Sequence, residues 1–309
     1  MRAVRFALIL WLLGLVTASI SAQELKCHKS VQQVRHRPVV VVPPDTQDTA
    51  EALAEPDAPE LEGSSTSAWS PPPQIRWQWI LSLPGNHDFG KSAELYDVDM
   101  FPTRKADVTK LHAEGKKAVC YIDGGSWEKD RPDAKRFPKI VLGCPYQGYP
   151  DERWLDIRRI DILGPIMTDR IKLCKSKGFD AAQWDNLDGY YIAVTGFPLT
   201  AADQLKYNRY LADATRKQGL GVALENDIRQ SQEMAQNYDW AIFEMDRNDN
   251  AKCFYGSGCH EFDPFVNANK AVMVVDYNAV KDFCTLANGD NFNGIRKHED
   301  LGVWVKCCR

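Results

Sequence analysis

The stretch FDAAQWDNLDGYY, from Phe179 to Tyr191, leads an apolar run directly into acidic and amide side chains. Its apolar part ends at Asp185, and the segment WAIFEM at 240–245 repeats the arrangement with Glu244. Removing an ionised carboxylate from water costs free energy, so an acid at the end of a buried strand indicates a functional or structural role. These two segments therefore predict two strands whose carboxyl ends carry acids facing one pocket.

Short apolar runs alternate with amphipathic helical patterns from residue 76 onward. Helices are expected at 103–114, 164–177 and 200–218, and each is followed by a glycine, as helix ends often are. This alternation predicts an α/β protein, a single (β/α)₈ TIM barrel with a parallel sheet. An open doubly wound sheet is the alternative, but no GxGxxG phosphate loop follows the first strand. The expected strands are 76–82, 95–100, 117–123, 179–185, 220–226, 240–245, 271–277 and 303–307, with a further short one at 154–157.

The amino-terminal quarter of the chain differs in composition from the rest. Residues 1–22 resemble a secretory signal peptide, although an uncleaved anchor is the alternative. Residues 23–73 are rich in proline, and the part from 45 to 62 holds acids without Lys or Arg, which predicts a disordered linker. The barrel domain is expected over 74–309, in a secreted, extracellular protein that has left the membrane after signal cleavage.

The nine cysteines fit an oxidising compartment, and their spacing matches no common zinc motif. Cys253 and Cys259 are close enough in sequence to bridge a loop. Cys120 lies inside an expected strand and is interpreted as a buried free thiol. The net charge of −4 is mild and gives no sign of a nucleic-acid partner.

Acids are expected at most strand ends, where a (β/α)₈ barrel carries its catalytic groups. A single strand-end acid often caps a helix, but a set of this size indicates an acidic site. Tyr121 and Tyr277 are also expected near the strand mouths, where an aromatic ring can stack on a sugar. The strand-end acids are Asp99, Asp123, Asp185, Glu225, Glu244 and Asp276.

Several other chemistries lack their sequence motifs. The six histidines form no HExxH pair, and no metal ion or cofactor is expected. A serine nucleophile would need a GxSxG elbow, which is absent, and Gly124-Gly125 is interpreted as a simple turn. Paired carboxylates remain, and these are the groups that cleave glycosidic bonds.

Six segments together resemble the endo-α-1,4-polygalactosaminidase family, glycoside hydrolase family 114, over residues 74–309. The resemblance implies a (β/α)₈ barrel that cleaves α-1,4-linked galactosamine in microbial exopolysaccharide, the material of biofilms. It places the two catalytic carboxylates at Asp185 and Glu244. Sugar-binding positions are implied at Asp123, Asn186, Asp188 and Asn226. The segments are RWQWILS, AVCYIDGGSWE, RWLDIR, FDAAQWDNLDGY, GVALEND and WAIFEM.

The polymer that the resemblance implies carries protonated amines, so acids around the site should attract it. We expect this role for Asp99, Asp123, Asp188 and Asp276. Asp185 is interpreted as nucleophile or base and Glu244 as general acid, although the reverse assignment is also open. The alternatives are a barrel glycosidase acting on another α-linked galactose or hexosamine polymer, and a secreted carbohydrate-binding protein without turnover. In each case a monomer with a polysaccharide partner is expected.

Overall fold

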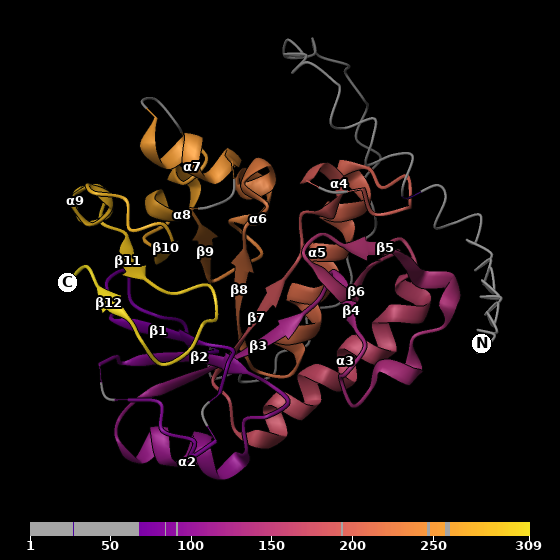
Figure 1. Cartoon of the computed structure of the whole chain (residues 1–309), viewed down its shortest axis with the longest axis horizontal. Helices are drawn as coiled ribbons and strands as arrows, with labels where there is room; N and C mark the ends of the chain where they lie inside the picture. Colours follow the sequence, from indigo (N-terminus) through magenta and orange to yellow (C-terminus); the bar gives the residue numbers. More distant parts are fainter. Residues whose placement is uncertain are drawn as a thin grey trace, which may run out of the picture.

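The computed structural model describes residues 27, 68–83, 85–90, 92–192, 194–245, 248–256 and 260–309. Its main sheet has parallel strands in the order β1-β2-β3-β7-β8-β9-β10-β11, and a short β12 pairs antiparallel with β11. This is the predicted TIM-barrel architecture (Figure 1). The strands are β1 Trp77–Ile80, β2 Leu95–Asp99, β3 Lys117–Asp123, β7 Ala181–Asp185, β8 Gly221–Glu225, β9 Trp240–Glu244, β10 Val272–Asp276, β11 Asn293–Arg296 and β12 Lys306–Cys307.

Helices alternate with the strands and cover the outside of the barrel (Figure 1). The three predicted helices correspond to α2, α3 and α5. Gly115, Gly178 and Gly219 follow them with positive φ, the conformation that ends a helix and that glycine adopts without strain. The helices are α2 Lys105–Ala113, α3 Ile160–Lys177, α4 Gly189–Ile192, α5 Ala201–Lys217, α6 Ser231–Met234, α7 Asn248–Tyr255, α8 Asp263–Asn267 and α9 Phe283–Gly289.

Side chains along each strand alternate between the barrel interior and the helical layer. Trp79, Tyr121 and Trp240 belong to the inner cluster of buried residues, whereas Trp184 packs with the outer one. Asp185 and Glu244 lie at positions of their strands whose side chains point into the barrel. The alternation therefore turns both acids toward the barrel axis, at the carboxyl ends of β7 and β9.

One side chain makes several of the hydrogen bonds across the seam between the first and last parallel strands. Asn293 accepts a hydrogen bond from Ile75 N at 2.8 Å and donates to Pro73 O at 2.9 Å and Val272 O at 3.1 Å. Its own carbonyl accepts a hydrogen bond from Trp77 Nε1 at 2.8 Å. A buried amide thus supplies the pairing that β1 and β11 do not make through their backbones.

One predicted strand was wrong. The run 303–307 was expected as the last strand of the parallel sheet, but that place belongs to β11, and the run contributes only the short antiparallel β12. The sequence of β11, NGIR, lacks an apolar pattern because its first residue is buried through hydrogen bonds. The short strand expected at 154–157 overlaps β6, which belongs to a separate sheet.

A three-stranded antiparallel sheet is inserted between β3 and α3. Its order is β4-β6-β5, and it lies beside the barrel at the carboxyl end of β3 (Figure 1). The β5–β6 hairpin contains register shifts, which re-aim side chains near its tip. The strands are β4 Ser126–Glu128, β5 Leu142–Tyr146 and β6 Tyr149–Leu155.

The interpretation of Cys120 as a free thiol was wrong. Cys120 points outward from β3 and is bonded to Cys174 of α3, with Cα atoms 6.1 Å apart. Within the described residues the free cysteine is Cys307. Cys253 is disulfide-bonded, while Cys259, its expected partner, lies outside the described residues. The remaining bridges are Cys27–Cys144 and Cys284–Cys308.

The expected signal peptide and most of the expected linker also lie outside the described residues. Residues 68–73 already pack on the barrel ahead of the expected boundary at 74, since the ring of Trp69 lies 6.2 Å from that of Trp240. Within the described part of the chain, no helix combines the length and apolarity needed to cross a bilayer.

Replacing Asn293 with alanine should lower the free energy of unfolding by about 2–4 kcal/mol, because it leaves buried backbone groups without partners. Urea denaturation would measure this loss. The matched control is Asn267→Ala on exposed α8, which should change the free energy by less than about 0.5 kcal/mol. Equal effects of the two variants would show that the side chain of Asn293 does not close the seam.

Candidate active site

Asp185 is held at the end of β7 by donors from β3, from the turn after β3 and from the residue that follows it. Tyr121 Oη donates to Asp185 Oδ2 at 2.6 Å, and the backbone N–H of Asn186 donates to Oδ1 at 2.5 Å. The amides of Gly124 and Gly125 donate to the carbonyl of Asp185 at 3.0 and 3.1 Å. A Cβ on Gly125 would overlap the carbonyl of Asn186, so this turn needs glycine to bring the ends of β3 and β7 together.

Glu244 is held at the end of β9 in a matching way. Tyr277 Oη donates to Glu244 Oε1 at 2.8 Å, and Asn226 Nδ2 donates to Oε2 at 3.1 Å. Asn250 of α7 fixes Asn226 by donating to its Oδ1 at 2.8 Å. The two predicted tyrosines therefore each bind one of the two predicted catalytic acids.

The end of β8 links the two acids. Asn226 follows Glu225 and bonds Glu244, while Gln183 of β7 donates to Glu225. Asn226 has a φ of 54°, a left-handed conformation that asparagine tolerates better than most residues. The predicted residues Glu225 and Asn226 thus form a hydrogen-bonded bridge between the strands that carry Asp185 and Glu244.

Asp123 is buried beside Asp185 and is well supplied with donors. Ser126 donates to it through both its N–H and its hydroxyl at 2.6 Å, and Asn186 Nδ2 donates at 2.9 Å. Burial, and then the charge of Asp185, raises the pKa of Asp123 to about 6, although the bonds from Ser126 oppose this rise. Asp123 therefore changes charge close to neutral pH.

Three further acids near Asp123 or Asp185 were missed by the sequence reasoning. Burial and the charge of Asp123 raise the pKa of Glu128 to about 7. Burial and the charges of Asp123, Glu128 and Asp185 raise the pKa of Glu152 to about 8. Both lie on the inserted sheet. No sequence pattern predicted that this sheet packs next to the carboxyl end of the barrel.

The third missed acid is Asp97, in the middle of β2. It is 0% exposed, and no donor among the described residues bonds to either carboxylate oxygen. Burial, and then the charge of Asp185, raises its pKa well above the usual range. Asp97 lies two residues after Leu95, which belongs to the inner cluster, so both side chains point into the barrel. This alternation in the sequence could have identified Asp97 as a candidate.

The other predicted acids have structural partners. Arg131 Nη1 contacts Asp99 Oδ2 at 2.6 Å, and Arg296 Nε lies 3.1 Å from Asp276 Oδ2. Asp188 is fully buried, and its charge contributes, after burial, to raising the pKa of Asp227 to about 9. A substrate contact for Asp99, Asp188 or Asp276 stays a prediction, and the two arginines already balance two of these charges.

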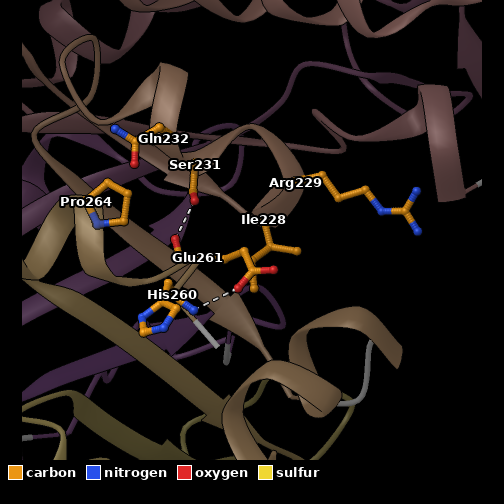
Figure 2. A pocket seen from close by; sticks show the side chains of 7 residues that line it. All are labelled: Ile228, Arg229, Ser231, Gln232, His260, Glu261 and Pro264. Carbon is orange, nitrogen blue, oxygen red and sulfur yellow. Dashed lines mark hydrogen bonds between the residues drawn. The ribbon is translucent and has the colours of Figure 1, made fainter. Parts of the chain in front are cut away.

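A hollow of about 330 Å³ lies apart from these acids (Figure 2). Its polar groups bond to one another, since Ser231 donates to the carbonyl of Glu261 and His260 N donates to Glu261 Oε2 at 2.9 Å. The side chain of Arg229 points away from the hollow in Figure 2. None of the catalytic candidates lines it, so the chemistry is assigned from the acids at the strand ends.

Two solved structures are similar to this chain in fold. Ega3 of Aspergillus fumigatus, solved in complex with galactosamine, matches with a TM-score of 0.70 and 28% identity, covering 80% of this chain and 100% of that one. The glycoside hydrolase domain of PelA from Pseudomonas aeruginosa matches with a TM-score of 0.57 and 11% identity, covering 73% and 95%, and supports the fold alone.

Among curated proteins, no sequence matches this chain. The family model of glycoside-hydrolase family GH114 matches residues 58–309, which is most of the chain. The matched region contains the barrel, the inserted sheet and all of the acids described above. The chain therefore belongs to glycoside-hydrolase family GH114 and is a glycoside hydrolase.

Proposed function

We propose that this enzyme hydrolyses α-1,4-linked galactosamine within a cationic, deacetylated exopolysaccharide, and that Asp185 and Glu244 carry the reaction. The observation that supports this most strongly is the pairing of each acid with its own tyrosine at the ends of β7 and β9. Galactosamine bound to the similar Ega3 supports the choice of sugar. A secreted, extracellular enzyme acting on biofilm polysaccharide fits this substrate.

The two acids take different roles in this proposal. Asp185 acts as nucleophile or base, since its bonds from Tyr121 and the N–H of Asn186 favour an ionised carboxylate. Glu244 donates a proton to the leaving oxygen and is oriented by Tyr277 and Asn226. Cleavage needs both groups because one carboxyl must be protonated while the other is charged.

Electrostatic attraction is the second element of the proposal. Galactosamine units carry protonated amines near neutral pH, so the polymer is a polycation. Asp123 lies beside Asp185, Glu128 lies near Asp123, and their pKa values are about 6 and 7. Their charges, added to that of Asp185, would attract the polymer in proportion to the fraction that is ionised.

The catalytic pair can be tested with Asp185→Asn and Glu244→Gln. Each should lower kcat on the deacetylated polymer by roughly 10²–10⁴-fold, the range of a lost acid or base. On an oligogalactosaminide with a 4-nitrophenolate leaving group, Glu244→Gln should recover much of the rate, because that group leaves without protonation. Asp185→Asn should stay inactive. Recovery in Asp185→Asn alone would reverse the roles, and full activity of either variant on the polymer would refute the pair.

The affinity for the polymer should depend on pH with a defined sign. Asp123 and Glu128 lose their charge as pH falls through about 6 and 7, while the amines stay protonated. The Kd of a deacetylated oligosaccharide for the Glu244→Gln variant should therefore rise several-fold between pH 7 and pH 5. Calorimetric titration would measure it, and a Kd that stays constant or falls would contradict the electrostatic account.

A further inference from the structure

The β5–β6 hairpin presents an exposed aromatic ring in a fixed orientation. Tyr149 is 57% exposed, yet its ring contacts Tyr146 edge to face at 5.6 Å. Tyr146 in turn stacks on Trp154 with ring centroids 4.7 Å apart. The hairpin thus presents the ring of Tyr149 to solvent, with its edge supported by Tyr146.

The surroundings of Tyr149 place it near the catalytic acids. Partial burial raises the pKa of its phenol, and the charges of four acids add to the rise. Two of these acids are Asp185 and Glu244, at the ends of β7 and β9. The others are Glu152 of the same strand and Glu299 of the segment between β11 and β12. An exposed ring within electrostatic reach of both catalytic carboxylates is placed to stack on a sugar bound between them.

Glu152 is an acid without a Lys or Arg partner in the described structure, and its pKa of about 8 keeps much of it protonated at neutral pH unless a cation binds beside it. It lies directly opposite Glu128 in the β4–β6 ladder, an arrangement of like charges that destabilises a sheet. Arg131 Nε binds Glu128 at 2.5 Å. By contrast, the contact of Glu152 in the described structure is the hydroxyl of Ser126 at 3.3 Å, with no Lys or Arg in that part paired to it.

Asp97 is a second, independent observation that points to a ligand in this region, because a ligand could donate hydrogen bonds to it. Its carboxylate is fully buried, faces the barrel interior and lacks a hydrogen-bond partner among the described residues. The charge of Asp185 acts on both Asp97 and Glu152. Acids of β2, β3 and β6 therefore lie within electrostatic reach of Asp185, and bound positive charge would relieve their repulsion.

We propose that Glu152 pairs with the ammonium group of a galactosamine unit next to the scissile bond, while Tyr149 stacks on the ring of that unit. This inference rests on the proposed function and names the residues that recognise the amine. The inserted sheet then selects for deacetylated polymer. An N-acetylated unit offers no charge to Glu152, so binding it would leave the carboxylate unpaired near Asp185.

Binding of a deacetylated α-1,4-galactosamine oligosaccharide tests this proposal. Calorimetric titration is made with the full-length Glu244→Gln protein, with and without Glu152→Gln. We expect Glu152→Gln to raise Kd roughly tenfold, the effect of losing one charged hydrogen bond. The effect should shrink in high salt. The Kd of the N-acetylated oligosaccharide, which lacks the ammonium group, should not change.

Matched variants separate the proposed contacts from general effects of charge or shape. Asp151→Asn removes the same charge from the neighbouring residue, which is exposed and lies 2.8 Å from Lys129 Nζ, and should leave Kd within about twofold. Tyr149→Phe keeps the stacking ring and should bind normally, whereas Tyr149→Ala should bind several-fold more weakly.

The outcomes distinguish this inference from the proposed function. Equal Kd values for Glu152→Gln and Asp151→Asn, with polymer cleavage by the wild type intact, would overturn the inference alone. A wild type that neither binds nor cleaves the deacetylated polymer would overturn both. Weaker binding by Glu152→Gln that is specific to the deacetylated oligosaccharide would support the ammonium contact.

Discussion

Repulsion among carboxylates at the carboxyl end of the barrel is the constraint on which the arrangement of the site depends. The charge of Asp185 raises the pKa values of Asp97, Asp123 and Glu152, after the larger effect of burial. Like charges so close in a partly buried site cannot all ionise without cost. The hydrogen bonds around them determine which acids keep their charge, and so determine which can act on a substrate.

The polar partners of the acids can be understood from this constraint. Tyrosines bind the two catalytic candidates, and an asparagine at the end of β8 joins one of them to the neighbouring strand. Arginines neutralise the acids farther out, Asp99 and Asp276. Asp97 and Glu152 lie within electrostatic reach of Asp185 and have no Lys or Arg partner in the described part of the chain. A polycationic substrate would bring positive charge to these acids, which links the electrostatics of the fold to the sugar that it is proposed to cleave.

The sequence was sufficient to predict the parts of the fold that rest on local pattern. The acids Asp185 and Glu244 end apolar runs, so their place on strand ends was predictable from burial cost alone. By contrast, β11 was missed because Asn293 is buried through hydrogen bonds that only the assembled seam provides. The bond between Cys120 and Cys174 was missed for a similar reason, since it depends on how α3 packs on β3.

The same limit applies to the site. Asp97 lies within a strand, so its position carried no strand-end signal, and Glu152 lies on an inserted strand that approaches Asp185 through tertiary packing. Distances between strand ends, and the cations that neutralise Asp99 and Asp276, also depend on the closed barrel. The sequence therefore indicated the residue types and the edge of the sheet on which they lie. The structure identified which of these acids have cationic partners among the described residues.

The most direct test of the account is reducing-end release by the wild type from one polymer preparation, assayed in deacetylated and fully N-acetylated form. The account predicts rapid release from the deacetylated polymer and slow or no release from the acetylated one, because only the first balances the acids around Asp185. Equal rates on the two forms, or cleavage of the acetylated form alone, would contradict it.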